Sequence, residues 1–262
     1  MSHIRLTIVD ELATLTIANP PQNRIDMQMV DELAATLEEI ARGRARALLV
    51  HAEGPDFSFG GDIVAWPNMT SRELRTLFES YMATFNRFER LPIPTVVAVQ
   101  GLCFGGGLEL AVRADVIFAG ETARFGHPEQ SIGIVKLLGG VYRVAERAGR
   151  SRAIEWALTS EQVPAAVMQA HGVVNRVVAD ADLLAEATAF AGKVGKGPTL
   201  AHAAHKALLR IWTTGGVAAA DEALSDIAMP LFETADVKLA LQTSVEAFLA
   251  AKPRPAFSFK GQ

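Results

Sequence analysis

Apolar and polar residues alternate near the N-terminus, which predicts β-strands because successive side chains of a strand point to opposite faces. Residues 4–9 and 13–17 form two such runs, and the acidic pair at 10–11 supplies the turn between them. After a segment rich in proline and asparagine, Asp26 is a candidate N-cap, and apolar residues recur at helical spacing from 30 to 40. The chain is therefore expected to begin with a β-hairpin and an amphipathic helix.

Strands and helices continue to alternate up to about residue 120. Thr70 and Glu73 form a capping-box sequence at the start of a second helix, whose apolar stripe is expected to lie in the core. Short continuous apolar runs follow the pattern of buried parallel strands. The strands expected here are residues 47–50, 95–99 and 116–119, and the helices are residues 70–88 and 105–113. This alternation predicts βαβ units and a mainly parallel sheet.

The chain from about residue 180 onward is predicted to be helical. Four segments carry an apolar stripe at helical spacing, and glycine or proline separates several of them. These segments are residues 182–193, 199–211, 217–232 and 237–251. They fit either a small separate domain or a layer that mediates oligomerisation. The basic tail at 252–262 fits either a solvated segment or a phosphate contact.

Composition narrows the class of protein. Half of the 262 residues are hydrophobic, which is enough for a full-sized core. The 25 basic and 29 acidic residues give a net charge of −4, without the basic excess typical of nucleic-acid-binding proteins. The apolar runs are shorter than the roughly 20 residues of a membrane-spanning helix. With a single cysteine, Cys103, and no recognisable leader sequence, we expect a cytoplasmic protein without nucleic-acid or membrane partners.

Two glycine-rich segments follow predicted strands: FSFGGDI at 57–63 and GLCFGGGLEL at 101–110. Glycine lets the backbone approach a ligand closely and leaves its N–H groups accessible. In the second segment the glycines also open a helix, whose N-terminus carries a partial positive charge. Such N–H groups can stabilise an oxyanion. Each segment taken alone is also explained as a tight turn between a strand and a helix.

Two glutamates lie near these segments. Glu109 stands in the first turn of the glycine-led helix, where a charge that favours the helix dipole is the simpler interpretation. Glu129 lies in FGHPEQSIG at 125–133, where a solvated loop carboxylate is the simpler interpretation. His127 is a weaker candidate for acid–base chemistry, because an ordinary histidine titrates near neutrality. Sequence spacing does not show whether the two carboxylates converge.

Several other classes of site are not indicated. GLCFGGG lacks the G-x-G-x-x-G spacing of dinucleotide-binding segments, and no Gly-Lys-Ser/Thr of a P-loop follows it. The sequence contains no G-x-S-x-G nucleophile elbow, and Cys103 has no matched base. The histidines and the cysteine show no metal-ligand spacing, so no metal is expected.

These same segments resemble the crotonase family, also called the enoyl-CoA hydratase/isomerase family. FSFGGD resembles the family's first oxyanion-hole segment, and VQGLCFGGGLELAVRADVIFAGETARFGHPEQSIGI resembles the second. GRSRAIEWALTSEQVPAAVMQAHGVVNRVV is similar to the stretch that follows the active site, and AFLAAKPRPAF is similar to the C-terminal end. The resemblance covers most of the chain.

The resemblance implies an α/β fold, the crotonase-like ββα spiral, with a helical C-terminal region for oligomerisation. The catalytic core is expected at residues 1–195, and the helical region at residues 196–262 is expected to build a homotrimer or a dimer of trimers. The resemblance implies that no metal and no redox cofactor are needed, and that coenzyme A enters as part of the substrate. Acyl-CoA metabolism, such as fatty acid β-oxidation, is the implied setting.

The implied activity is hydration of a 2-enoyl-CoA thioester. Gly61 and Gly106 are the implied oxyanion-hole donors, which polarise the thioester carbonyl. Glu109 is expected to activate water for attack on the β-carbon while Glu129 supplies the α-proton. The implied substrate-binding residues surround these positions or lie in the basic tail: Phe59, Gly60, Asp62, Ile63, Trp66, Gly105, Lys136 and Lys260.

The sequence departs from the family pattern where relatives shape the acyl pocket. Phe59 stands where a small residue is expected, Trp66 follows soon after, and GIVKLLGG replaces a loop that commonly contains proline. Lys136 in that loop fits either a surface charge or a pocket contact. The acyl group is therefore left open. An enoyl-CoA isomerase that relies mainly on Glu129, another acyl-CoA lyase, and a non-catalytic acyl-CoA- or RNA-binding homologue are the alternatives.

Overall fold

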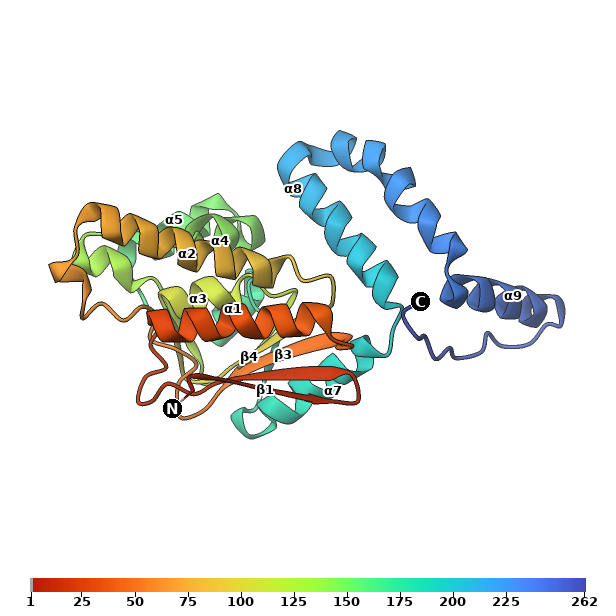
Figure 1. Cartoon of the computed structure of the whole chain (residues 1–262), viewed down its shortest axis with the longest axis horizontal. Coiled ribbons are helices and arrows are strands. Elements are labelled where there is room, and N and C mark those ends of the chain that lie inside the picture. Colours follow the sequence, from red (N-terminus) through yellow and green to blue (C-terminus); the bar gives the residue numbers. More distant parts are fainter. Residues whose placement is uncertain (1) are drawn as a thin grey trace. The chain divides into compact units, whose positions relative to one another are not determined.

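The computed structural model describes residues 2–262, which form two compact units (Figure 1). The first unit comprises the described residues up to Leu91 together with Thr95–Ala191. The second unit comprises Pro92–Pro94 and Gly192–Gln262. The first unit contains every strand of the two sheets, and the second is helical.

A six-stranded sheet forms the centre of the first unit, in the order β1-β2-β3-β4-β6-β9. The first two strands pair antiparallel, as the predicted hairpin requires, and all the other neighbours pair parallel. The strands are β1 Ile4–Val9, β2 Leu12–Ile17, β3 Ala47–Ala52, β4 Thr95–Val99, β6 Val116–Gly120 and β9 Arg176–Val178. The predictions of the hairpin and of a mainly parallel sheet are confirmed; β9 was not predicted.

A second sheet of three short strands positions the candidate site. It contains β5 Leu102–Phe104, β7 Arg124–Gly126 and β8 Val163–Pro164. The strands β5 and β7 run parallel, and Phe104 lies opposite Gly126. Because both strands end at the same edge, the segments that follow them emerge side by side. This sheet was not predicted, since its strands are too short to give a periodic pattern.

Helices pack against the large sheet. The predicted caps are present: Asp26 accepts a hydrogen bond from the backbone N–H of Met29 at 2.8 Å, and Thr70 and Glu73 form a reciprocal capping box. One face of the sheet packs against α7, whose Leu183, Ala187 and Ala191 lie in a core cluster with residues of β3, β4 and β6. The helices of this unit are α1 Met27–Arg42, α2 Ser71–Glu89, α3 Gly106–Ala111, α4 Gly140–Ala148, α5 Arg150–Thr159 and α6 Ala165–Ala170, and α7 spans Leu183–Gly195.

The apolar stripe of α2 is divided between two environments. Phe85 and Phe88 are fully buried, as predicted for core positions. Phe78 and Tyr81, nearer the start of the helix, instead line a cavity. The N-terminal part of the stripe therefore shapes a binding site, which periodicity alone does not distinguish from core packing.

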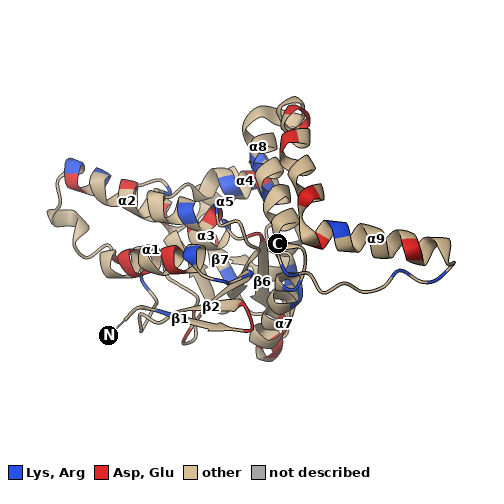
Figure 2. Ribbon diagram, turned by 45° about the vertical axis from the view of Figure 1, so that its right-hand side comes forward, with Lys and Arg blue, Asp and Glu red and all other residues tan. Residues whose placement is uncertain are grey.

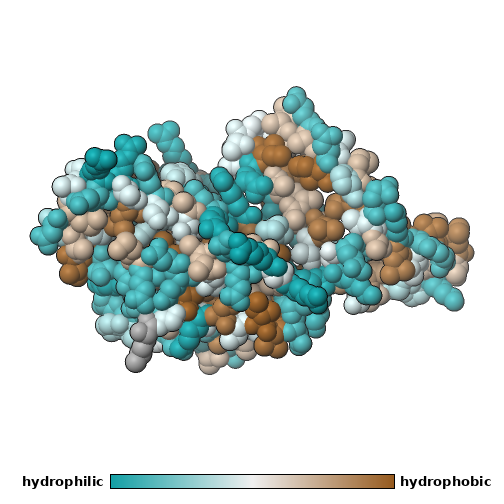
Figure 3. Space-filling view, viewed as in Figure 1, coloured by the Kyte–Doolittle hydropathy of each residue, from teal (hydrophilic) through white to brown (hydrophobic). Residues whose placement is uncertain are grey.

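The second unit consists of α8 Thr199–Ala228 and α9 Ala235–Leu249 with short connections. Gly216 has a φ of 74° inside α8, and this kink separates the two helical segments that the sequence predicted there. Apolar side chains on this unit are exposed, among them Phe248 and Leu249 of α9, and Figure 3 shows hydrophobic surface over these helices. Oligomerisation through residues 196–262 stays a prediction.

Charged residues of both signs lie along the helices (Figure 2). On α2, for example, Arg75 pairs with Glu79 one turn further along at 2.7 Å. Such mixed charge differs from the single-sign surface that attracts a polyanion. Within residues 2–262, no helix is both long enough and apolar enough to cross a membrane.

Candidate active site

A cavity of about 310 Å³ lies in the first unit, and most of its wall is apolar. Two carboxylates and two glycine segments interrupt that wall. Aliphatic and aromatic side chains from residues 59–66, from α2 and from the loop before α4 supply most of the rest. The lining residues are Arg24, Ile25, Phe59, Gly61, Ile63, Trp66, Phe78, Tyr81, Phe104, Gly105, Gly106, Glu109, Pro128, Glu129, Ser131, Ile132, Ile134, Leu137 and Leu138.

The two glycine segments lie against each other at the cavity. A side chain on Gly60, whose φ is +90°, would meet the backbone N of Gly106 and the carbonyl oxygen of Phe104, each at 2.9 Å. A β-carbon on Gly106 would lie 3.7 Å from the backbone N of Gly61. Only glycine at these positions allows the two backbones to come this close. The structure therefore brings together the two segments that the sequence singled out.

The backbone N–H groups of Gly61 and Gly106 are the expected oxyanion donors. The bridge between Ile25 and the first segment uses the carbonyl of Gly60 and the N–H of Asp62, so the N–H of Gly61 takes no part in it. Gly106 is the first residue of α3, and the first N–H groups of a helix have no partner within the helix. Both glycines line the cavity, as expected for a pair of oxyanion donors.

Glu109 projects from α3, and one oxygen of its carboxyl accepts hydrogen bonds from the backbone. Its Oε1 accepts hydrogen bonds from the backbone N–H of Leu138 at 2.8 Å and of Gly140, the first residue of α4, at 2.9 Å. Burial raises the pKa of the Glu109 carboxyl, while the positive charge of Lys136 and the two backbone hydrogen bonds act in the opposite direction. The net rise favours a carboxyl that exchanges protons closer to neutrality than an exposed glutamate.

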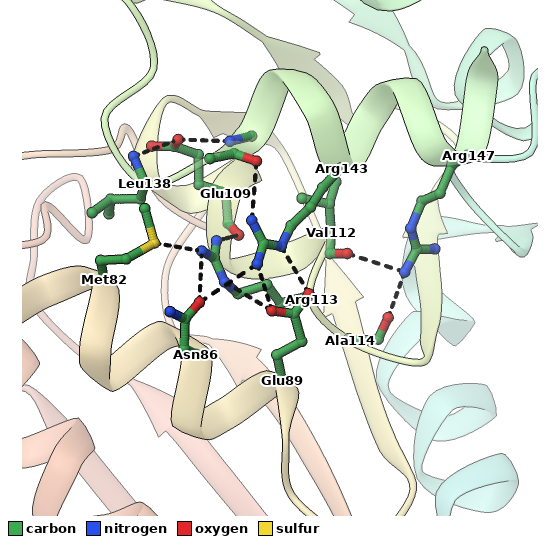
Figure 4. A network of polar contacts seen from close by, with 12 residues as sticks. Met82, Asn86, Glu89, Glu109, Val112, Arg113, Ala114, Leu138, Arg143 and Arg147 are labelled. Carbon is green, nitrogen blue, oxygen red and sulfur yellow. Dashed lines mark hydrogen bonds and ion pairs between the residues drawn. The ribbon is translucent and has the colours of Figure 1, made fainter. Parts of the chain in front are cut away.

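A polar network behind Glu109 ties three helices together (Figure 4). The Nη1 of Arg113 donates to the backbone carbonyl of Glu109 at 2.8 Å. Glu89 of α2 lies 3.7 Å from the Nε of Arg113 and accepts two hydrogen bonds from Arg143 of α4, at 2.8 and 2.6 Å. The network thus joins α2, α3 and α4, the last of which provides a backbone donor to Glu109.

The guanidinium of Arg113 is the most desolvated charge of this network. Burial lowers the pKa of Arg113 to about 10, the nearby positive charge of Arg143 adds to this, and Glu89 opposes it. Further along α4, Arg147 donates to the carbonyls of Val112 and Ala114 at the end of α3. Sequence reasoning missed these residues; the available signal was an arginine four positions after Glu109 inside an otherwise apolar stretch.

Glu129 lies opposite, in a short 3-10 helix at Pro128–Ile132 rather than in the irregular loop that the sequence suggested. Its Oε1 is 3.4 Å from the Nζ of Lys136. Its Oε2 is buried and has no hydrogen-bond partner among residues 2–262. A β-carbon on Gly105 would approach the Oε1 of Glu129 to 2.9 Å, so glycine at this position makes room for the carboxylate. The two glutamates do converge on one cavity.

The remaining candidate side chains divide into two groups. Phe59, Ile63, Trp66 and Gly105 line the cavity, and their contact with a substrate stays a prediction. Gly60, Asp62, Lys136 and Lys260 are not among its lining residues. Gly60 has no side chain and so allows the two glycine segments to come close. Asp62 accepts a hydrogen bond from the backbone N–H of Val64 at 3.2 Å.

Lys136 and Lys260 occupy positions that the sequence did not anticipate. The side chain of Lys136 is only 2% exposed, so the alternative of a surface charge is wrong. Lys260 belongs to the second unit, where its backbone N–H donates to the carboxylate of Asp236 at 2.9 Å. A phosphate contact of its side chain stays a prediction.

Arg24 also lines the cavity and was not among the predicted residues. Its Nη1 lies 3.4 Å from the carbonyl oxygen of Gly61, and its guanidinium lies 5.8 Å from the ring centroid of Phe59. The sequence offered little signal for this role, because Arg24 belongs to a turn-rich segment read only as the approach to a helix. The guanidinium of Arg24 is thus a cation beside Gly61, one of the candidate oxyanion donors.

The structure argues against chemistry at His127 and Cys103. Neither ring nitrogen of His127 has a hydrogen-bond partner in the described part of the chain, and the ring is buried. Burial, reinforced by the charge of Lys136, lowers the pKa of His127 to about 3, so the suggestion that it titrates near neutrality is wrong. Burial raises the pKa of the Cys103 thiol, which disfavours the reactive thiolate.

Among the residues that the structure describes, no three His, Cys, Asp or Glu side chains gather as a metal site requires. The donor set of the cavity is instead two carboxylates and backbone N–H groups. Such groups suit proton transfer and the binding of a carbonyl oxygen.

Known proteins similar to this chain show its family. Residues 7–259 match the family model described as enoyl-CoA hydratase/isomerase. Relatives named "probable enoyl-CoA hydratase" from Mycobacterium bovis and Bacillus subtilis are each 31% identical, over 71% and 74% of this chain and 73% and 76% of theirs. The crystal structure of an enoyl-CoA hydratase subunit from Geobacillus kaustophilus has a TM-score of 0.89 and 27% identity, and covers 99% of this chain and 98% of its own. The chain therefore belongs to the enoyl-CoA hydratase/isomerase, or crotonase, family and has the crotonase fold.

Proposed function

We propose that the protein is an enoyl-CoA hydratase, which adds water across the 2,3 double bond of a 2-enoyl-CoA thioester. The observation that carries the proposal is the convergence of Glu109 and Glu129 on a cavity that also contains Gly61 and Gly106. The family to which the chain belongs supports an enzyme acting on acyl-CoA thioesters. Coenzyme A is then part of the substrate, and we propose no separate cofactor.

The two glycines are proposed to bind the thioester carbonyl oxygen. Donation from the N–H groups of Gly61 and Gly106 withdraws electrons from the conjugated enoyl group and makes its β-carbon electrophilic. When water adds, the negative charge moves to this same oxygen as an enolate. Donors fixed in advance stabilise that charge without reorganisation, and removal of one such donor costs roughly 10²- to 10³-fold in rate in well-studied enzymes.

The two glutamates are proposed to share the proton transfers. Glu109 takes a proton from water as the water oxygen bonds to the β-carbon, and Glu129 donates a proton to the α-carbon of the enolate. The proton on Glu109 then returns to Glu129, so that the net addition is one H and one OH. A base works best when its pKa lies near the operating pH, and the raised pKa of Glu109 is consistent with this requirement.

The apolar wall supports an apolar acyl group. Trp66 and Phe78 lie edge to face with ring centroids 5.1 Å apart, beside the glycine segment that carries Gly61. Burial of an apolar group against such a wall stabilises the complex by about 25 cal/mol per Å² of surface removed from water. We propose an apolar 2-enoyl group of the kind processed in fatty acid β-oxidation.

Isomerisation is the main alternative, because moving a double bond from the 3,4 to the 2,3 position needs only one carboxylate to carry a proton between carbons. The two reactions are separated by offering the protein a 2-enoyl-CoA and a 3-enoyl-CoA. A hydratase consumes the conjugated chromophore of the first and requires both glutamates. Isomerisation would be the better assignment under two results together. The wild type would not hydrate the 2-enoyl ester, and Glu109→Gln would still convert the 3-enoyl ester.

The helical region at residues 196–262 is proposed to build a homotrimer or a dimer of trimers, in the cytoplasm. Exposed apolar side chains on α8 and α9 support this proposal, because extensive apolar surface on a single chain is typical of an interaction face. Light scattering after size-exclusion chromatography measures the mass directly. A monomer of 28.1 kDa at micromolar concentration would contradict the proposal.

A further inference from the structure

We propose that Lys136 is a positioning residue of the site: its ammonium fixes one oxygen of Glu129 and balances the charge of the two glutamates. The proposal rests on the function proposed above and extends it to a residue in a loop where this sequence departs from the family pattern. It also replaces the expected role of Lys136 as a substrate contact.

The contacts of Lys136 lead to Glu129 and to the start of α3. Its Nζ donates to the backbone carbonyl of Gly105 at 3.0 Å and lies 3.4 Å from the Oε1 of Glu129. The same carbonyl accepts the N–H of Glu109, so the ammonium sits at the first turn of the helix that carries the other glutamate. One buried cation thereby links the two elements that bear the carboxylates.

The backbone leaves room for this pair at two glycines. A β-carbon on Gly140 would come within 2.6 Å of the Cδ of Lys136, and a β-carbon on Gly105 within 2.9 Å of the Oε1 of Glu129. The same β-carbon on Gly140 would lie 2.7 Å from the Cγ of Glu109. These two glycines therefore leave room for Lys136 and for both glutamates.

The pair gives Glu129 an arrangement like that of Glu109. In Glu109, two backbone N–H groups bind Oε1. In Glu129, Lys136 binds Oε1, and Oε2 is left without a hydrogen-bond partner in the described chain. Each carboxyl thus has one oxygen fixed by the protein.

Charge balance gives Lys136 its second effect. Burial and any negative charge on Glu129 disfavour an ionised Glu109, and a neighbouring cation relieves both effects. The charged groups around Glu109 are Lys136, Glu129 and Arg113, and among them Lys136 has the largest effect in lowering the pKa of Glu109. Loss of this cation should raise the pKa of Glu109 and leave less of it ionised at a given pH.

The direct test is Lys136→Met, which keeps an unbranched side chain one atom shorter and removes its charge. In protein labelled with ¹³C at the glutamate carboxyl carbons, the Glu109 resonance is the one missing from the Glu109→Gln variant. Its titration midpoint is expected to rise by about one pH unit or more in Lys136→Met. This measurement requires no turnover, so it separates failure of this inference from failure of the proposed hydratase activity.

The pH dependence of hydration provides the second readout. Because the base must be ionised, the deficit in kcat of Lys136→Met relative to the wild type should be roughly tenfold greater at the acid end of the profile than at the alkaline end. The KM for the acyl-CoA should change little, since Lys136 does not line the cavity. A merely structural role would lower kcat by the same factor at every pH.

Two further variants complete the test. Lys193→Met makes the same chemical change at an exposed position on α7 and should leave both readouts unchanged. Lys136→Gln retains a donor for the carbonyl of Gly105 without the charge and carries the test if the methionine variant does not fold. An unmoved Glu109 midpoint with an unchanged pH profile overturns the proposal, as does a tenfold rise in KM at constant kcat, which would make Lys136 a substrate contact.

Discussion

The two sides of the cavity hold their carboxylates by different means. On the Glu109 side, the backbone of Leu138 and Gly140 binds the carboxyl, and a network centred on Glu89 supports that backbone. On the Glu129 side, a single side chain, that of Lys136, binds the carboxyl. Backbone donors cannot be removed by one substitution, whereas a lysine can. The comparison therefore predicts that the Glu129 side is the more easily changed by mutation.

The largest effect is expected for Gly105→Ala. The new β-carbon would lie 2.9 Å from the Oε1 of Glu129, and the φ of +51° is unfavourable for alanine. Displacement of Glu129 should lower kcat by about 10²-fold, within the range that a single general acid contributes. Steady-state kinetics with a 2-enoyl-CoA measure the change.

A matched control separates backbone strain from displacement of the carboxylate. Gly54 has a φ of +84°, and a β-carbon there would meet no atom within 4 Å. Gly54→Ala should therefore cost about 1 kcal/mol in the free energy of unfolding and leave kcat unchanged. Equal loss of turnover in both variants would show that strain, not Glu129, explains the first result.

A smaller effect is expected for Gly140→Ala on the other side of the cavity. Its β-carbon would lie 2.7 Å from the Cγ of Glu109 and 2.6 Å from the Cδ of Lys136, whose flexible side chain can move. We expect kcat to fall roughly tenfold, measured in the same assay. Gly192→Ala is the control, because a β-carbon at that position would meet no atom within 4 Å. Alanine there lies in a helix and should raise the free energy of unfolding by up to about 1 kcal/mol.

Glu89→Gln tests the support of α4. It removes the charge that binds Arg143 and faces the buried Arg113, so the free energy of unfolding should fall by about 1–3 kcal/mol. This loss is smaller than the cost of breaking a fully buried ion pair, because the side chain of Glu89 is one-third exposed. Urea denaturation measures this loss. Glu155→Gln, which breaks an exposed pair with Arg152, should cost under about 1 kcal/mol; equal losses would contradict a special role for Glu89.

His127 should make the fold sensitive to acid. Its folded-state pKa of about 3 lies below the ordinary value of 6.5, so the unfolded chain binds the proton first. Stability from the neutral ring is complete above pH 6.5 and falls as pH drops toward 3, by about 1.4 kcal/mol per pH unit. His127→Leu should reduce this slope in urea denaturation between pH 6 and 4. An unchanged slope would show that other groups cause the acid sensitivity.

Sequence patterns predicted the parts of the fold that depend on local signals. The hairpin at residues 4–17, the cap at Asp26 and the capping box at Thr70 are local, and each was found where the pattern placed it. Strands β5 and β7 were missed because three residues cannot show alternation. These are the strands that bring the two glutamates together, so the convergence could be expected only from the family resemblance.

The environment of the site was least accessible to prediction. Lys136 looked like a surface or pocket charge because nothing in the order of residues indicates that its side chain is enclosed. Phe78 and Tyr81 looked like core residues because a helical stripe has the same period whether it faces a core or a cavity. Contacts between distant segments, such as that of Glu89 with Arg143, depend on packing that the sequence does not display locally.

Addition of water to the double bond is the central claim, and it is measured most directly in water enriched with ¹⁸O. The purified protein is incubated with crotonyl-CoA, and the mass of the product is measured by mass spectrometry. The wild type should form a 3-hydroxyacyl-CoA that carries one ¹⁸O atom, and Glu109→Gln and Glu129→Gln should form little of it. Absence of the labelled product from the wild type, while a 3-enoyl-CoA is still isomerised, would contradict the account.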